Sequence, residues 1–433
     1  MALRLDSRAP DFAARFARLV EKQRAQAADV RAEVEAILAR VAAEGDAALL
    51  DYTARFDRQR LRPDQLRVGA DEIARAVDGC PARLRAALEL AASRIGDFHR
   101  RQLPEDLDHR DELGVRQVLR WRPIQAVGIY VPGGTAAYPS SVLMNAVPAR
   151  IAGVARIAMA VPAPGGALNP LVLVAAHLAG VDEIYRIGGA QAIAALAFGT
   201  VSVPRVDKIV GPGNAYVAEA KRQVFGRVGI DMIAGPSEIV VVADGRQDPE
   251  WIAADLLSQA EHDELAQAVL FTDSPVLADA VVAAVERQLD TLPRRAIAAA
   301  SWRDLGAVVL LEDLADAPAL VDRLAPEHLE LLVAEPEAMA ARIENAGAIF
   351  LGAHTPEVIG DYVGGPNHVL PTDRSARFAS GLSVYDFLKR TTLLACPEDA
   401  FRALGPAAAE LARAEGLEGH ARAVALRLGP GRE

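Results

Sequence analysis

The sequence predicts an α/β fold with two parallel-sheet units, and three observations support this prediction. From residue 125 onward, short apolar runs alternate with helical stretches. The runs are continuously apolar, as in parallel strands that helices cover on both faces. Most runs end in Gly or Pro, so we expect tight turns at the strand ends. The carboxyl edge of such a sheet is where ligands tend to bind.

The hydrophobic pattern of the first hundred residues predicts helices. The charged segment that follows indicates a linker or an exposed hairpin. Apolar side chains recur at helical spacing between charges in residues 10–100, as at Val30, Val34, Ile37, Leu38 and Val41. Residues 101–117 are strongly charged.

Two sets of strands follow, which we interpret as two α/β units of similar design. The first set of strands is expected at 126–131, 155–162, 183–189, 207–213 and 237–244, and its helices at 140–153, 168–180, 190–199 and 214–225. The second set begins with a helix near 249–261, and its strands are expected at 268–273, 307–313, 328–335 and 346–352. We expect residues 380–433 to form a helical tail.

Composition excludes several classes of protein. The chain has 433 residues and a formal charge of -11, whereas general nucleic-acid binding needs a basic face. Its two cysteines, Cys80 and Cys396, lack the spacing of metal ligands. The start lacks an apolar signal segment, and no run of eighteen apolar residues occurs, so we expect a cytoplasmic protein without membrane contact.

Four polar residues could together bind a metal ion. Gln259 and His262 stand one helical turn apart in LLSQAEHDE, where a polar helix end is the alternative interpretation. Asp361 precedes a Gly-Gly-Pro turn and could equally be a turn residue, and His420 in the tail could be an exposed polar side chain. A mixed nitrogen and oxygen set suits zinc, with manganese or cobalt as substitutes.

Glu327 and His328 are adjacent in LAPEHLELL and could supply acid–base chemistry. Neighbouring residues do not share a face of a helix or strand, so each would act on a different atom. A histidine can serve as a general base near neutral pH. In the alternative interpretation, Pro326 starts a helical turn and Glu327 is its N-terminal acid.

Several glycine turns could accept a nucleotide, although none has the standard pattern. The turn Gly211-Pro-Gly213 follows a predicted strand and precedes a predicted helix, with Asp231 about twenty residues on. Tyr216 stands where the third glycine of a dinucleotide fingerprint would be. Two further turns contain glycine pairs, at Gly133-Gly134 and Gly188-Gly189.

Read together, these segments resemble the histidinol dehydrogenase family. The ordered set from about residue 120 to the end includes VDKIVGPGNAYVAEAK, LLSQAEHD, APEHLEL, GDYVGGPNHVLPT and EGLEGHARAVALRL. The resemblance implies two incomplete Rossmann-like parallel-sheet domains in one globule, plus small helical terminal segments. The implied parts are an N-terminal helical arm (1–24), a first α/β domain (25–120 with 238–378), a second Rossmann-like domain (121–237) and a C-terminal helical tail (379–433).

The resemblance also implies an activity, its cofactors and an assembly. The activity is the NAD-dependent four-electron oxidation of L-histidinol to L-histidine through L-histidinal, the last steps of histidine biosynthesis. One Zn²⁺ per subunit would be bound by Gln259, His262, Asp361 and His420. The protein would be a homodimer, and its tail would cross to the partner subunit and complete the partner's site.

Each site residue of this sequence receives a role from the resemblance. His328 matches the general base, and Glu327 matches the residue that activates water. The implied substrate contacts are Ser237, Gln259, His262, His328, Asp361, Glu415 and His420. The implied NAD contacts are Tyr130, Gln191 and Asn214, so Asp231 would not be a ribose ligand.

Two other functions compete with this one. A related zinc-dependent dehydrogenase of another small polar alcohol would be expected to keep Glu327 and His328 but to lose Glu415 and His420, which are both present here. A zinc hydrolase or a non-catalytic binding protein on an α/β scaffold would need no dinucleotide, so saturable NAD binding would distinguish it.

Overall fold

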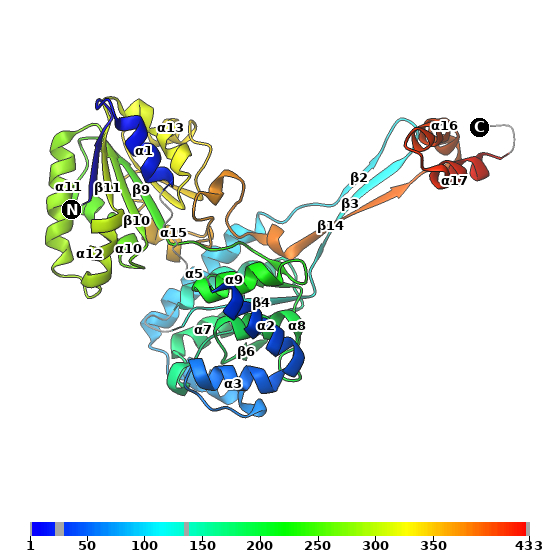
Figure 1. Cartoon of the computed structure of the whole chain (residues 1–433), viewed down its shortest axis with the longest axis horizontal. Coiled ribbons are helices and arrows are strands. Elements are labelled where there is room, and N and C mark those ends of the chain that lie inside the picture. Colours follow the sequence, from blue (N-terminus) through cyan, green and yellow to red (C-terminus); the bar gives the residue numbers. More distant parts are fainter. Residues whose placement is uncertain (1, 22–29, 134–137, 430–433) are drawn as a thin grey trace. The chain divides into compact units, whose positions relative to one another are not determined.

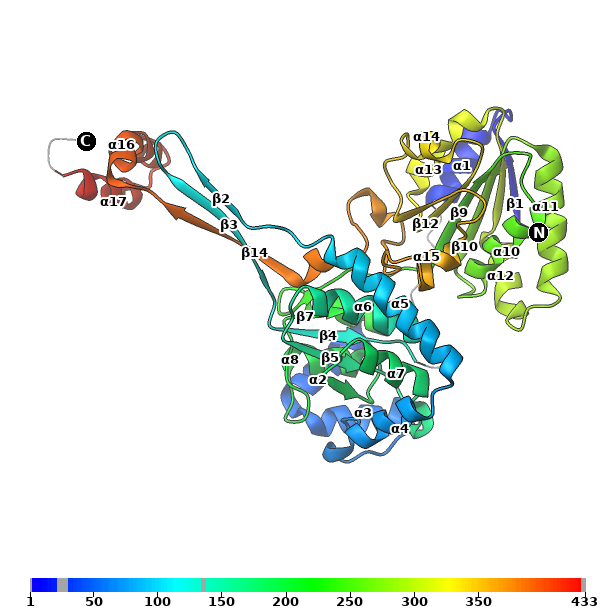
Figure 2. The ribbon, with the colours of Figure 1, turned by 180° about the vertical axis from the view of Figure 1, so that it is seen from behind.

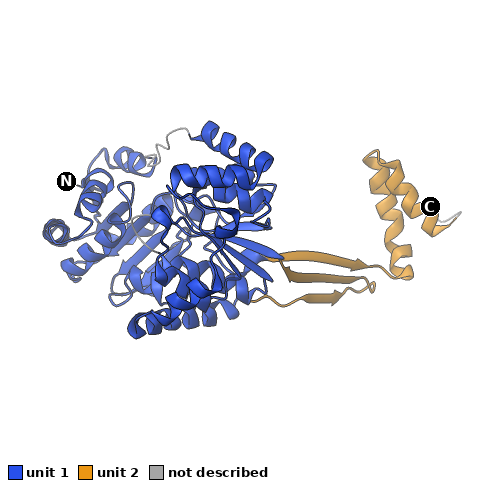
Figure 3. Cartoon of the chain, turned by 90° about the horizontal axis from the view of Figure 1, so that it is seen from below, with its two compact units in different colours: residues 1–102, 124–387 blue, residues 103–123, 388–433 orange. Residues whose placement is uncertain are grey.

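The computed structural model describes residues 2–21, 30–133 and 138–429, which form two compact units. Unit 1 comprises residues 1–102 and 124–387, and unit 2 comprises residues 103–123 and 388–433 (Figure 3). Unit 1 contains two parallel sheets, and unit 2 contains a small antiparallel sheet and two helices. The predicted α/β class, with two parallel-sheet units, is therefore confirmed.

Sheet A is parallel throughout and has the strand order β1-β11-β10-β9-β12-β13 (Figure 1). Its strands are β1 (Leu3–Asp6), β9 (Glu238–Ala243), β10 (Gln267–Thr272), β11 (Ala307–Leu310), β12 (His328–Leu332) and β13 (Ala348–Leu351). One face packs on α10 (Pro249–Ala260), α11 (Pro275–Leu289) and α12 (Arg295–Leu305), and the other on α1 (Phe12–Glu21) and α13 (Ala317–Leu324). Both faces are covered, and this explains why β9 and β10 are buried along their whole length.

The helices of sheet A begin at residues suited to that position. Asp248 accepts a hydrogen bond from the Glu250 N–H at the start of α10, and Ser274 accepts one from Leu277 N–H at the start of α11. A proline occupies the first turn of both helices, where its missing N–H costs nothing.

Sheet B is also parallel, with the strand order β6-β5-β4-β7-β8. Its strands are β4 (Ala126–Tyr130), β5 (Arg156–Ala160), β6 (Glu183–Tyr185), β7 (Lys208–Val210) and β8 (Gly229–Ile230). The connecting helices are α6 (Pro139–Ile151), α7 (Pro170–Leu178), α8 (Gly189–Phe198) and α9 (Ala215–Val224). The ends of these strands and helices lie within four residues of their predicted positions, apart from β8, which was not predicted.

Both sheets contain five strands in the order of a doubly wound dinucleotide-binding fold, without its sixth strand. Along the chain, β4 to β8 lie in the order third, second, first, fourth, fifth, and so do β9 to β13. The strand order reverses beside the first strand, between β4 and β7 in sheet B and between β9 and β12 in sheet A. This is the topology expected of two incomplete Rossmann-like units.

The predicted domain boundaries remain predictions, but two structural features differ from them. Residues Leu3–Asp6, within the expected helical arm, form strand β1, which pairs in parallel with β11. A four-residue edge strand is too short to show a period in the sequence. The second difference concerns residues 25–120, which were assigned to the domain containing 238–378.

The described helices within residues 31–100 pack on sheet B and its helices instead (Figure 2). These helices are α2 (Arg31–Glu44), α3 (Asp46–Phe56), α4 (Ala70–Asp78) and α5 (Ala82–Arg100). Val34, Ile37 and Val41 of α2 share a core with Ile193 and Leu196 of α8. Helical periodicity identifies an apolar face but does not identify the surface that this face covers, and this explains the difference.

The sequence left a linker and an exposed hairpin as alternatives for residues 101–117, and the structure has a hairpin. Strands β2 (Leu107–Arg110) and β3 (Arg116–Pro123) form an antiparallel hairpin, and β14 (Leu388–Ala395) joins β3 in the order β14-β3-β2. At the hairpin turn, Asp111 Oδ1 accepts hydrogen bonds from Leu113 and Val115 N–H. Two helices that pack on each other complete the unit, α16 (Glu398–Ala414) and α17 (Glu418–Leu428). The tail was predicted to be helical throughout, so β14 is an addition.

The remaining described elements are short. They are α14 (Pro336–Ala340), α15 (Glu357–Tyr362) and the 3-10 turns Pro63–Gln65, Pro164–Gly166, Leu314–Asp316, Ser375–Arg377 and Val384–Phe387. No helix in the described ranges combines the length and the apolar character that crossing a membrane requires.

A buried ion pair fixes the glycine turn after β7. Lys221 and Asp231 side chains are 2% and 1% exposed, and the Lys221 ammonium contacts both Asp231 and the Gly211 carbonyl oxygen, the latter at 2.8 Å. The Gly211 N–H donates to Asp231 Oδ2 at 2.7 Å. A Cβ at Gly211, whose φ is +106°, would lie 2.2 Å from the Tyr130 carbonyl oxygen. The two carboxylate oxygens of Asp231 thus both accept hydrogen bonds within the fold, one from the Lys221 ammonium and one from the Gly211 N–H.

Removing one partner of this pair is expected to be costly, because the other charge would stay buried without compensation. We predict that Asp231→Ala lowers the free energy of unfolding by about 3–5 kcal/mol, measured by chemical denaturation. Asp64→Ala is the control, because its partner Arg62 and Asp64 itself are both about two-thirds exposed, at 69% and 68%. Equal denaturation midpoints for Asp231→Ala and the wild type would contradict this account.

Candidate active site

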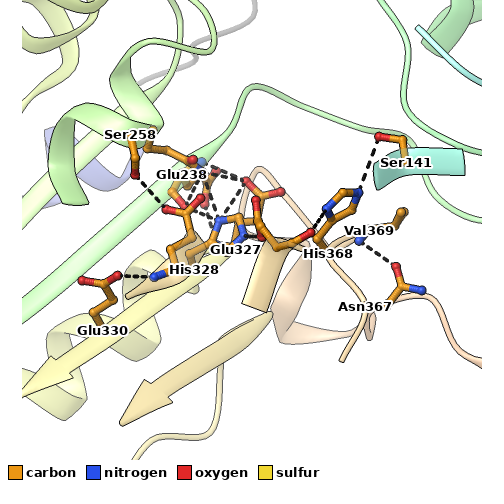
Figure 4. A network of polar contacts seen from close by, with 12 residues as sticks. Ser141, Glu238, Ser258, Glu327, His328, Glu330, Asn367, His368 and Val369 are labelled. Atoms are coloured by element: carbon orange, nitrogen blue, oxygen red, sulfur yellow. Dashed lines mark hydrogen bonds and ion pairs between the residues drawn. The ribbon is translucent and has the colours of Figure 1, made fainter. Parts of the chain in front are cut away.

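A cluster of buried polar side chains lies at the amino edge of sheet A (Figure 4). Glu238 is the first residue of β9, and His328 is the first residue of β12. Gln259 is in the last turn of α10, which returns antiparallel to the strands and so ends beside their starts. The sequence led us to expect ligands at the carboxyl edge of the strands, whereas this cluster lies at the amino edge of sheet A.

His328 is 3% exposed, and its two ring nitrogens have different surroundings. Nδ1 lies 3.1 Å from the Glu238 carbonyl oxygen, which can only accept a hydrogen bond. A proton on Nδ1 satisfies that contact, and in the neutral imidazole it leaves Nε2 without one. Nε2 lies 3.4 Å from Asp361 Oδ1 and has no hydrogen-bond partner among the described residues. Nε2 is therefore the atom available for proton transfer or for a ligand.

Glu327 contacts the same region from the other side. Its Oε2 accepts a hydrogen bond from Glu238 N–H at 2.9 Å and lies 3.6 Å from His328 Nδ1. Helix α13 ends at Leu324 and β12 begins at His328, so no helix starts at Pro326. The alternative interpretation of Glu327 as the first acid of a helix is thus wrong.

Helix α15 adds two carboxylates, Glu357 and Asp361, spaced by one helical turn. Glu330 Oε1 accepts a hydrogen bond from Glu357 N–H at 2.7 Å and so ties the start of α15 to β12. His328, Glu357 and Asp361 offer ligand atoms that all lie within 4.8 Å of one another, a grouping that could bind a metal ion. Sequence reasoning missed Glu357, although its i, i+4 spacing from Asp361 in PEVIGDY was a usable signal.

The cluster gathers several carboxyl groups in a buried place, and burial together with their mutual interactions shifts their pKa values. Burial raises the pKa of Glu327 to about 8 and that of Glu357 to about 7. Burial alone would lower the pKa of His328, but the charges of Glu357, Glu327 and Asp361 outweigh it and raise that pKa well above the ordinary value. Burial opposes ionisation of Asp361 too, yet contact with His328 lowers its pKa. Such a cluster suits a bound cation.

Two further histidines lie around Asp361. Burial lowers the pKa of His262, although the nearby charge of Asp361 opposes this, so His262 is held neutral as a metal ligand must be. His368 Nδ1 lies 2.9 Å from the Asp361 backbone oxygen, and its Nε2 lies 3.5 Å from Ser141 Oγ. The sequence analysis gave His368 no role; in the structure it positions the Asp361 peptide.

The predicted metal and substrate residues fall into two groups. Gln259, His328 and Asp361 lie in the cluster, with His262 close by and Ser237 directly before β9. Glu415 and His420 belong to unit 2, where both are exposed, at the end of α16 and in the first turn of α17.

The predicted NAD contacts gather elsewhere, at the carboxyl edge of sheet B. Tyr130 ends β4, Gln191 lies in the first turn of α8, and Asn214 caps α9 by accepting a hydrogen bond from Val217 N–H. The Tyr130 hydroxyl accepts a hydrogen bond from Gly189 N–H at 3.1 Å. Of the glycine turns proposed from the sequence, Gly134 lies outside the described residues.

These features define a class of protein: a doubly wound α/β enzyme with a nucleotide-type sheet edge and a separate, buried acid–base centre that can bind a cation. A family model, "Histidinol dehydrogenase", matches residues 20–428. The chain therefore belongs to the histidinol dehydrogenase family, a family of oxidoreductases.

Individual relatives match over nearly the full length. The chain is 62% identical to the histidinol dehydrogenase of Ruegeria pomeroyi over 98% of both chains, and 62% identical to that of Rhodospirillum rubrum over 100% of both. The crystal structure of histidinol dehydrogenase from Elizabethkingia anophelis superposes with a TM-score of 0.94 at 37% identity, covering 99% of this chain and 98% of that one.

The raised pKa of Glu327 predicts how stability depends on pH. Between the ordinary value of 4.5 and about 8, the folded state retains a proton that the unfolded state has lost, so stability falls as pH rises through this window. Gln cannot ionise, so Glu327→Gln avoids this loss. With a chelator present, we expect the Tm of the variant relative to wild type to increase between about pH 5 and about pH 8, by roughly 2–4 °C or more.

The exposed substitution Glu337→Gln is the control for this experiment and should give the same Tm difference at both pH values. A Glu327→Gln advantage that is constant, or that shrinks as pH rises, would show that Glu327 is ionised in the folded protein.

Proposed function

We propose that this chain catalyses the NAD-dependent oxidation of L-histidinol to L-histidine through L-histidinal, the last steps of histidine biosynthesis. One observation carries the proposal: His328 Nε2 is buried beside the Asp361 carboxylate without a hydrogen-bond partner among the described residues, and Glu327 lies against the other ring nitrogen. This is a general base beside a carboxylate that could activate water. Membership of the histidinol dehydrogenase family supports the choice of substrate.

The metal in this proposal is one Zn²⁺ per subunit, bound by Gln259, His262, Asp361 and His420. The charge of the cluster supports a cation, since several carboxylates are buried around one imidazole. The Gln259 amide nitrogen donates to the Glu238 carbonyl oxygen at 3.2 Å, so its own carbonyl oxygen is the atom suited to a cation. When bound, zinc would orient the imidazole and amino nitrogens of the substrate.

His328 would act in both oxidation steps. Its Nε2 would take the proton of the alcohol as the first hydride passes to NAD, and would then release that proton to solvent. It would take a proton again from the hydrated aldehyde as a second hydride passes to a second NAD. The Glu238 carbonyl oxygen keeps the Nδ1 proton in place, so that Nε2 is the basic atom each time. Glu327 would take a proton from the water that adds to the aldehyde. Its raised pKa makes its carboxylate a stronger base than an exposed one.

The substrate contacts would be Ser237, Gln259, His262, His328, Asp361, Glu415 and His420. NAD would bind at the carboxyl edge of sheet B through Tyr130, Gln191 and Asn214. Gln191 supports this, because it is 1% exposed and both polar atoms of its side chain lack a hydrogen-bond partner among the described residues. Its amide could therefore both donate to and accept from a ligand.

We propose a homodimer in which the tail, residues 379–433, completes the partner's site with Glu415 and His420. Both side chains are exposed in the described chain, and β14 leaves Leu394 69% exposed. Apolar and ligand-type side chains left uncovered in this way favour a partner surface. The net charge of -11 argues against nucleic acid, and we place the enzyme in the cytoplasm, without membrane contact.

The reaction has a defined stoichiometry that can be measured. Purified protein given L-histidinol and excess NAD should release two NADH for each histidinol consumed, followed by absorbance and product analysis. The activity should be lost after chelation and restored by zinc. Absence of NADH from zinc-replete protein would refute the proposed substrate, and one NADH per histidinol would refute the second oxidation.

Substrate choice separates this proposal from a related zinc-dependent dehydrogenase of another small polar alcohol. Glu415→Gln removes a charge that would recognise the substrate, so the KM for histidinol should rise roughly tenfold or more. Glu410→Gln, also exposed on α16, is the matched control and should leave KM unchanged. If KM were unchanged for Glu415→Gln as well, another alcohol would become the better candidate.

A further inference from the structure

Asp57, directly after α3, lies over the carboxyl edge of sheet B. The Gly188 N–H, in the turn between β6 and α8, donates to its carboxyl group. The Asp57 backbone oxygen accepts a hydrogen bond from Gly165 N–H at 3.3 Å, in the turn that follows β5. Asp57 therefore lies where the second and third strands of the sheet end.

Polar atoms around this point are buried without partners. Asp57 Oδ2 has no hydrogen-bond partner among the described residues, and neither polar atom of the Gln191 side chain has one. Gln191 is three residues from Gly188 and only 1% exposed. Burial is the main cause of the raised pKa of Tyr130, and the nearby charge of Asp57 adds to it. Buried polar groups are costly unless they are paired, so this group fits a ligand that both donates and accepts hydrogen bonds.

The charge of Asp57 selects the chemistry of that ligand. A carboxylate repels phosphate, whereas it accepts hydrogen bonds from hydroxyl groups. In doubly wound folds, an acidic residue near the end of the second strand binds the ribose hydroxyls of a dinucleotide. Here β5 is followed by Val161, Pro162 and Ala163, which cannot do so. Asp57 brings a carboxylate to the same place from a helix that precedes the sheet in sequence.

We propose that Asp57 accepts hydrogen bonds from the adenosine ribose hydroxyls of the dinucleotide and thereby favours NAD over its 2′-phosphorylated form. The proposal rests on the dehydrogenase function proposed above. It adds a specificity-determining residue to Tyr130, Gln191 and Asn214. A 2′-phosphate would meet the Asp57 carboxylate and be disfavoured by like-charge repulsion.

The test compares coenzymes in matched variants. Asp57→Asn keeps an acceptor oxygen for Gly188 N–H but removes the charge, and Asp57→Ala removes both. Asp64→Asn, exposed in the next turn of the chain, is the control. The kcat/KM is measured with NAD and with NADP at saturating L-histidinol, and binding of NADH and NADPH is measured by fluorescence titration.

We expect Asp57→Asn to raise the KM for NAD roughly tenfold and to raise the NADP-to-NAD ratio of kcat/KM by roughly tenfold or more. The KM for histidinol should not change, and Asp64→Asn should behave as wild type. A folded Asp57→Asn with an unchanged coenzyme ratio would overturn the proposal. So would an equal loss with both coenzymes, because that would indicate a structural role only.

Failure of the proposed reaction can be distinguished from failure of this inference. If the wild type oxidises histidinol with neither coenzyme, the proposed function fails, and the NADH and NADPH titrations decide on Asp57 independently. If Asp57→Ala does not fold, the isosteric Asn variant carries the comparison. Binding that favours NADH in the wild type and not in Asp57→Asn supports the role of Asp57.

Discussion

The burial of Glu327, Glu357 and Asp361 around the imidazole of His328 is the constraint on which the site depends. Carboxylates in a low-dielectric place stay charged only if positive charge lies near them. In this chain His328 supplies part of that charge, and its ring is fixed by the Glu238 carbonyl oxygen on Nδ1. A bound cation would neutralise the remaining negative charge of these carboxylates and return His328 toward the neutral form that a general base needs. In the proposed function, metal binding and base catalysis would therefore be coupled through one set of charges.

In the proposed function, the two tasks of a dehydrogenase fall on two similar sheets. The strand order of β9 to β13 matches that of β4 to β8, yet the buried polar cluster lies at the amino edge of sheet A, whereas the residues proposed to contact NAD lie at the carboxyl edge of sheet B. Helix α10 makes the amino edge usable, because its last turn brings Gln259 beside the starts of β9 and β12. At the other edge, the Lys221–Asp231 pair fixes Gly211, and Asn214 begins α9 three residues later.

Much of this could be predicted from the sequence, and the omissions have physical reasons. The continuous apolar runs identified the inner strands, since these are buried on both faces. Strand β1 was not predicted, because four residues are too few to show a hydrophobic period. The helices of residues 31–100 were assigned to the other sheet, because the position of an apolar face in the sequence does not indicate which surface it covers. Gln259, His328 and Asp361 were identified and lie together. Glu357 was missed although its spacing from Asp361 was a usable signal, and its burial appears only in the fold. Asp57 was missed because its unpaired carboxylate oxygen is likewise visible only in the fold.

The central claim is that a cation binds in the buried cluster through Gln259, His262 and Asp361. The most direct measurement is X-ray diffraction from crystals grown with zinc and L-histidinol, recorded on both sides of the zinc absorption edge. The account predicts one anomalous peak per subunit within coordination distance of the Gln259 carbonyl oxygen, a ring nitrogen of His262 and the Asp361 carboxylate. A peak bound instead by His328 and Glu357, or no peak in this cluster, would contradict the assignment of His328 as the free base.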